Sequence, residues 1–110
     1  MRVFTVKAFG RFQRREGISD AALCKAVQDA EGGLVDANLG GGLIKLRVAR
    51  KGQGKRGSFR ILLAFRIRDR AVFLYGFAKS DRDNIDVDEL KEFRWRAVEL
   101  LGEGSKASRR

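Results

Sequence analysis

The segment LIKLRVARKGQGKRGSFRILLAFRIR, residues 43–68, decides the fold of this chain. It contains two runs in which apolar residues recur at every second position, the pattern of half-buried β-strands. The apolar face of the first run consists of Ile44, Leu46 and Val48, and that of the second consists of Phe59, Ile61, Leu63, Phe65 and Ile67. A glycine-spaced basic segment separates the two runs, so we predict two neighbouring strands joined by a loop.

Cations fill the middle of this segment. Between the first and last of them the chain has seven basic residues and no acid: Lys45, Arg47, Arg50, Lys51, Lys55, Arg56 and Arg60. Like charges this close repel one another, and a polyanion would neutralise them. Arg60 lies inside the second strand on the face opposite Phe59 and Ile61, in line with Arg66. We therefore expect the strands to present a platform of cations to a nucleic acid.

The N-terminal part indicates a strand followed by two helices. The β-rich VFTV segment, residues 3–6, predicts the strand, and Phe9 with Phe12 gives the first helix a thin apolar stripe. Ser19 or Asp20 is the expected N-cap of the second helix. The apolar positions of that helix are Ala22, Leu23, Ala26, Val27 and Ala30, with Cys24 packing as a small apolar residue and Gly32-Gly33 ending the helix.

The C-terminal part indicates a third long strand and a last helix. The run AVFLYGFA, residues 71–78, is apolar at nearly every position, which is typical of a central strand covered on both faces. Asp86 and Glu89 resemble a capping box at the start of the helix. The apolar stripe of the helix is Leu90, Phe93, Ala97, Val98 and Leu101, and Gly102 is expected to end it.

These elements predict an α+β domain with the order β-α-α-β-β-β-α. Three consecutive strands joined by short loops form an antiparallel meander, and the helices are expected to cover one of its faces. The domain spans residues 1–102, and residues 103–110 form a C-terminal tail that frays.

Composition restricts the chemistry more than any motif. The chain has 110 residues, a formal net charge of +10, one cysteine and no histidine. The charge favours a nucleic acid or an acidic protein as partner. Without histidine, histidine-based nucleophile pairs and tetrahedral zinc sites are excluded, and we expect no metal and no cofactor. A single cysteine fits a reducing cytoplasm, and no apolar run reaches the roughly 20 residues that span a bilayer, so we expect a cytoplasmic protein without a membrane partner.

Two stretches resemble a known family. LIKLRVARKGQGKRGSFRILLAF, residues 43–65, and FLYGFAKSDRDNI, residues 73–85, are similar to the RelE/ParE superfamily of bacterial toxins, and most of all to its HigB-like RelE branch. The resemblance extends from about Val3 to Leu101. It implies a RelE-like fold in which two N-terminal helices pack on a small curved antiparallel sheet.

The resemblance also implies an activity and its residues. Members of this branch are toxins of type II toxin-antitoxin systems that cut mRNA on the translating ribosome, and a cognate antitoxin silences them. Cleavage needs no metal, because the RNA 2′-hydroxyl attacks its own adjacent phosphate. The catalytic positions implied here are Lys51, Lys55, Arg60 and Lys79. The residues expected to bind mRNA or rRNA phosphates are Lys45, Arg47, Arg50, Arg56, Arg66, Arg68 and Arg82. The chain departs from RelE at Ser80, where RelE has a second arginine, and at Ile85 and Asp86, where RelE has a tyrosine.

Two other functions stay open. The same cations would serve a non-catalytic RNA-binding module, and ParE-like members of the superfamily inhibit gyrase instead of cutting RNA. Two aromatic residues also have alternative roles. Tyr75 is either a core residue with a satisfied hydroxyl or an active-site phenol. Trp95 lies off the apolar stripe of the last helix, where it either anchors a partner or packs on a neighbouring loop.

Overall fold

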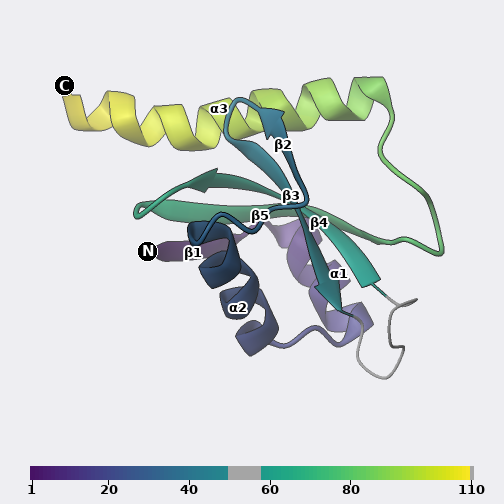
Figure 1. Cartoon of the computed structure of the whole chain (residues 1–110). Coiled ribbons are helices and arrows are strands. Elements are labelled where there is room, and N and C mark those ends of the chain that lie inside the picture. The colour runs from purple at the N-terminus through teal and green to yellow at the C-terminus, as the bar shows by residue number, and fades with distance from the viewer. Residues whose placement is uncertain (50–57, 110) are drawn as a thin grey trace.

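A computed structural model describes residues 1–49 and 58–109, and within that part a sheet lies between two helical layers (Figure 1). The elements in chain order are β1 (Arg2–Thr5), α1 (Lys7–Glu16), α2 (Asp20–Glu31), β2 (Ala37–Gly40), β3 (Leu43–Ala49), β4 (Ser58–Arg66), β5 (Arg70–Ala78) and α3 (Val87–Arg109). The class is α+β, as predicted. None of the described helices is long and apolar enough to cross a membrane.

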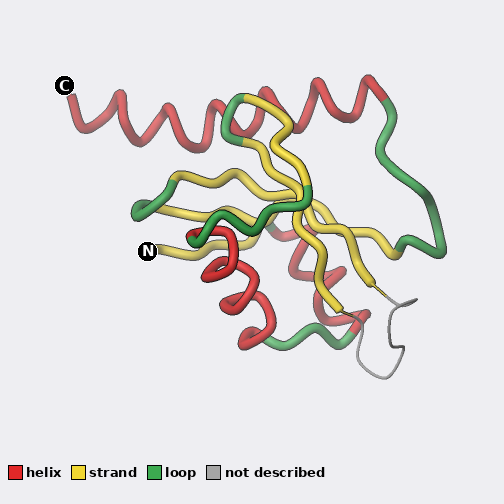
Figure 2. Tube along the Cα trace, viewed as in Figure 1, coloured by secondary structure: helices red, strands yellow, loops and turns green. Residues whose placement is uncertain are grey.

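The sheet has the strand order β1-β5-β4-β3-β2, and Figure 2 shows its strands in yellow. The predicted antiparallel meander is present as β3, β4 and β5. The expectation of a purely antiparallel sheet is wrong, because β1 runs parallel to β5. The expected element order also lacked β2, a strand of four residues that pairs antiparallel with β3. A strand this short, with the sequence ANLG, carries no alternating pattern that would predict it.

The helices occupy both faces of the sheet, so the prediction of one covered face is wrong. In Figure 1, α1 and α2 lie on one side of the sheet and α3 lies on the other. The physical reason is that the middle of β4 is apolar on both faces. Ile61 and Leu63 belong to the core beneath α1 and α2, whereas Leu62 and Ala64 belong to the core beneath α3. Both sets must be covered, and one helical layer cannot cover them.

The predicted helix termini are largely confirmed. The Ser19 hydroxyl accepts a hydrogen bond of 3.0 Å from the Ala22 N–H at the start of α2. Asp86 and Glu89 form a reciprocal capping box, with hydrogen bonds of 2.8 and 2.9 Å between the carboxylate of each and the backbone N–H of the other. The expected end at Gly102 is wrong, because α3 continues to Arg109.

Two local features adjust the packing. The pairing of β4 with β5 shifts between Leu62 and Leu63, which are opposite Tyr75 and Phe73. This β-bulge turns both Leu74 and Tyr75 towards the α3 core. The expectation for Cys24 is wrong, since its side chain is exposed. It lies next to Leu23 on α2 but off the buried face of the helix.

Candidate phosphate-binding site

The α3 face of the sheet changes character along β3 and β4. Near α3 it is apolar, with Leu43 and Leu62 in the core beneath the helix. At the end where β3 finishes and β4 begins it carries Lys45, Arg47 and Arg60, which we call the cation cluster. Side chains two residues apart on a strand share a face, so the same alternation that buries Leu43 and Leu62 places the cation cluster beside them.

Arg60 is the most buried member of the cation cluster. It is 8% exposed and is the buried charged residue of the described chain. Its Nη1 donates a hydrogen bond of 2.6 Å to the Ser58 hydroxyl, and its Nε lies 3.6 Å from a carboxylate oxygen of Asp36. A buried cation is stable only with such partners. The guanidinium is therefore held in one place instead of extending into solvent.

Asp36 is the acid of this site, and sequence reasoning missed it. Its carboxylate lies 3.8 Å from the Lys45 ammonium and 3.7 Å from the Arg47 guanidinium, in addition to Arg60. Its backbone N–H donates to the Lys45 carbonyl at 2.8 Å, which places it directly before β2. In the sequence, Asp36 is a single acid ahead of β2, a strand that the sequence pattern did not predict. This signal is too weak to assign Asp36 to the site.

The cluster is open to solvent on one side. A groove of about 470 Å³ on the α2 side meets the site only at Asp36 and Arg47, and neither Lys45 nor Arg60 lines it. Arg47 is the exposed member of the cation cluster, with 61% of its side chain accessible. An anionic ligand can therefore reach Arg47 without any rearrangement of the core, whereas the side chains of Lys45 and Arg60 are only 15% and 10% exposed.

Lys79 lies at the same end of the sheet. It follows β5 directly, and its backbone N–H donates to the Ser58 carbonyl at 3.3 Å. Ala49 and Ser58, which are paired across β3 and β4, also lie at this end. The predicted residues Arg50, Lys51, Lys55 and Arg56 fall outside the described residues. The chain positions that flank them nevertheless belong to the end of the sheet that holds Arg60.

Arg66 and Arg68 lie at the opposite end, so the predicted continuous platform is wrong. Arg66 is six residues from Arg60 along β4, a separation of roughly 20 Å at the usual rise of a strand. Its guanidinium lies 3.4 Å from Asp69 in the β4–β5 turn, and the Arg68 N–H donates to the Glu31 carboxylate at 2.8 Å. The face between the two ends is apolar and covered by α3. RNA binding by Arg66 and Arg68 stays a prediction.

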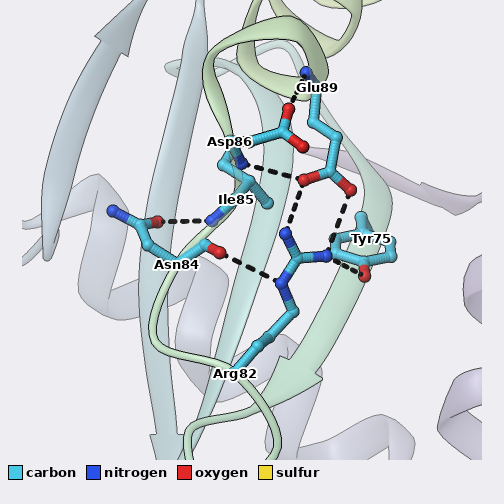
Figure 3. A network of polar contacts seen from close by, with 6 residues as sticks. All are labelled: Tyr75, Arg82, Asn84, Ile85, Asp86 and Glu89. Carbon is cyan, nitrogen blue, oxygen red and sulfur yellow. Dashed lines mark hydrogen bonds and ion pairs between the residues drawn. The ribbon is translucent and has the colours of Figure 1, made fainter.

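Arg82 lies in a network of polar contacts between β5 and α3 (Figure 3). Its two terminal nitrogens contact the Glu89 carboxylate at 2.6 and 3.1 Å, a bidentate pair. The Nη1 group also donates to the Tyr75 hydroxyl at 3.1 Å, and Nε donates to the Asn84 carbonyl at 3.0 Å. Figure 2 shows the loop that this network ties back to the sheet, between the end of β5 and the start of α3.

The network also shifts the pKa values of Arg82 and Glu89. The hydrogen bonds that Arg82 donates to Glu89 and Tyr75 raise the pKa of Arg82. The hydrogen bond from Arg82 and the backbone hydrogen bond with Asp86 hold the pKa of Glu89 below its ordinary value. Tyr75 is half-buried, with its ring stacked on Phe93 at 5.2 Å between centroids. Of its two predicted roles, a core residue with a satisfied hydroxyl fits these contacts.

The site offers cations and hydrogen-bond donors, which together suit a phosphate. Among the described residues, no three histidine, cysteine or acidic side chains come together as metal ligands. A guanidinium fixed by its own neighbours can present its remaining N–H groups to two phosphate oxygens. Arg47 and Lys79, both exposed, lie at the same end of the sheet.

Comparison with models of known protein families gives a match over nearly the whole chain. A model of the family described as the RelE toxin of the RelE/RelB toxin-antitoxin system matches residues 1–107 of the chain. No curated protein matches the chain. The matched range contains the whole sheet, α1, α2, all of α3 except its last two residues, and the cation cluster.

Proposed function

Because the chain belongs to the RelE family of toxins from toxin-antitoxin systems, we propose that it is an endoribonuclease that cuts mRNA on the translating ribosome. The observation that supports this most is Arg60, a buried arginine fixed by Ser58 and Asp36 at the end of the sheet where β3 finishes and β4 begins. A cation that served only for solubility would be exposed and free to rotate.

The reaction follows from the chemistry of RNA. The 2′-oxygen loses its proton to a base and forms a bond to the adjacent phosphorus. The bond from phosphorus to the 5′-oxygen breaks, and that oxygen takes a proton from an acid. The products are a 2′,3′-cyclic phosphate and a 5′-hydroxyl. Negative charge accumulates on the two non-bridging oxygens, and in our proposal Arg60 donates its hydrogen bonds to them.

Proton transfer is assigned to lysines. Lys51 and Lys55 are the proposed base and acid, in an order that stays open. Repulsion from the neighbouring Arg50 and Arg56 favours the neutral form of a lysine, which a base requires. Lys79 is proposed to contact the same phosphate from the end of β5. The assignment to a HigB-like branch stays a prediction.

The proposed partners are ribosome-bound mRNA, rRNA and an antitoxin. Lys45 and Arg47 supply phosphate contacts beside Arg60, and such contacts favour RNA without reading its sequence. A net charge of +10 suits association with a ribosome. The family pairs its toxins with a RelB-type antitoxin, so a cognate antitoxin is the proposed protein partner. The cytoplasm is the proposed location.

Induced expression in a bacterium tests this proposal. We expect growth to stop while translated mRNAs are cut, and we expect an Arg60→Ala protein made at the same level to cut far less. Growth arrest with intact transcripts and inhibited gyrase would instead identify a ParE-like inhibitor. Ribosome or RNA binding without any cut transcripts would identify a binding module.

A further inference from the structure

The pairing of β3 with β4 brings like charges together in the cation cluster, where they repel one another. In the register of β3 and β4, Arg47 lies directly opposite Arg60. Like charges directly opposite on paired strands destabilise a sheet. Lys45 shares the same face one step along β3, so three positive charges meet where one of them is buried.

Asp36 forms an ion pair with each of the three cations. Its carboxylate is within 3.6 to 3.8 Å of Arg60, Arg47 and Lys45. The carboxylate is also well placed by the backbone, since the Asp36 N–H is bonded to the Lys45 carbonyl. The pairing of β2 with β3 continues from this point, so the short strand β2 fixes where the carboxylate lies.

The geometry points to Asp36 as the positioning residue of Arg60. Asp36 faces Nε and Ser58 binds Nη1, and for the third guanidinium nitrogen the described residues supply no partner. An arginine has five N–H donors in a rigid plane, so fixing two nitrogens fixes the direction of the third. Asp36 acts through Arg60 and neither touches the RNA nor carries a proton.

This inference rests on the proposed function, and it differs from simple charge balance. If Asp36 only lowered the local positive charge, its removal would strengthen phosphate binding and leave the chemical step unchanged. If Asp36 orients Arg60, its removal leaves binding intact but slows the chemical step, because misplacing a catalytic group by about 1 Å costs up to roughly 100-fold in rate. Loss of charge balance alone would lower KM, whereas loss of the orientation of Arg60 would lower kcat.

The experiment uses the whole chain with translating ribosomes and a defined mRNA. We expect Asp36→Asn to lower kcat by roughly 10- to 100-fold with KM unchanged, and Asp36→Glu to recover part of the loss. Asp69→Asn is the matched control, because Asp69 also contacts three cations, all of them arginines, but lies at the far end of β4. It should leave kcat unchanged. In an Arg60→Ala background, Asp36→Asn should have no further effect, and additive losses would overturn the inference.

A second measurement keeps the inference testable if the protein cuts no RNA. The Nε–H group of Arg60 gives its own signal in a ¹⁵N–¹H NMR spectrum of the free protein. We expect Asp36→Asn to move that signal and speed its exchange with water, and Asp69→Asn to leave it in place. An Arg60 signal that Asp36→Asn leaves unchanged, in a folded protein, would overturn the positioning role whatever the activity.

Discussion

At the scale of single residues, two arginines of one strand have opposite surroundings. Arg60 is buried and held by Ser58 and Asp36, whereas Arg66 faces Asp69 in the turn at the far end of β4. Their separation by an even number of residues places them on the same face of β4 and suggests a common role. Their neighbouring residues, however, give them different environments. This difference could not be predicted from the sequence, because it depends on the position of α3, which covers the face of the sheet between the two arginines.

We expect Arg60→Ala to lower the cleavage rate by roughly 10²–10³-fold, as other donors to a developing oxyanion do. Ribosome binding should weaken far less, since one phosphate contact among many is lost. The matched variant Arg66→Ala should do the reverse, reducing the slope of log affinity against log salt by about one. Equal losses of binding and cleavage in Arg60→Ala, from single-turnover kinetics, would reduce Arg60 to a docking residue.

At the scale of elements, the Arg82–Glu89 pair ties the β5–α3 loop and the first turn of α3 to the sheet (Figure 3). The capping box at Asp86 and Glu89 was predictable from sequence, because its two residues are three positions apart, the spacing of that motif. The contact of Glu89 with Arg82 and Tyr75 was not, because it depends on the path of the loop.

This pair predicts a dependence of stability on pH. The pKa of Glu89 is lowered from its ordinary value of 4.5 in the folded chain. Its contribution is therefore fully present above pH 4.5 and is lost as pH falls through the lower, folded value. We expect the melting temperature of Glu89→Gln to be below that of the unsubstituted chain at neutral pH. The gap should close as the solution is acidified, and a gap that stays constant into acid would contradict the role of this charge.

The close packing of α1 on β5 leads to a second prediction. Phe12 of α1 packs directly on Gly76, and a Cβ at that position would overlap its ring. Gly76→Ala should therefore destabilise the fold by about 1–3 kcal/mol, the usual cost of overpacking a core. Gly102→Ala is the control, since Gly102 lies in a helix with open space around it. It should stabilise by about 0.5–1 kcal/mol, as measured by denaturant unfolding.

At the scale of the whole molecule, the sheet separates two cores. The patterns of β3, β4 and β5 were sufficient to predict the meander and the core beneath α1 and α2. The placement of α3 was not predicted, although Leu62, Ala64, Val72 and Leu74 form a second apolar surface. The parallel pairing of β1 was missed as well, since a four-residue edge strand carries no information about its direction.

The outer face of α3 provides a prediction about the antitoxin. Trp95 is 60% exposed, and the neighbouring Val98 is exposed too. We predict that this face takes part in the antitoxin interface and that Trp95→Ala loosens the complex by about 2 kcal/mol, as loss of an aromatic anchor does. Folding should be intact, because the side chain lies outside the core. Unchanged affinity in a titration with the antitoxin would remove Trp95 from the interface.

The central claim is that the end of the sheet holding Arg60 cuts mRNA on the ribosome. The most direct measurement maps new 5′ ends by primer extension in a reconstituted translation reaction with one defined mRNA. We predict cuts within the translated stretch when the purified chain is added, none when ribosomes are left out, and at least roughly 100-fold slower cutting with Arg60→Ala. An intact mRNA on ribosomes saturated with the protein, or equal cutting by Arg60→Ala, would contradict the account.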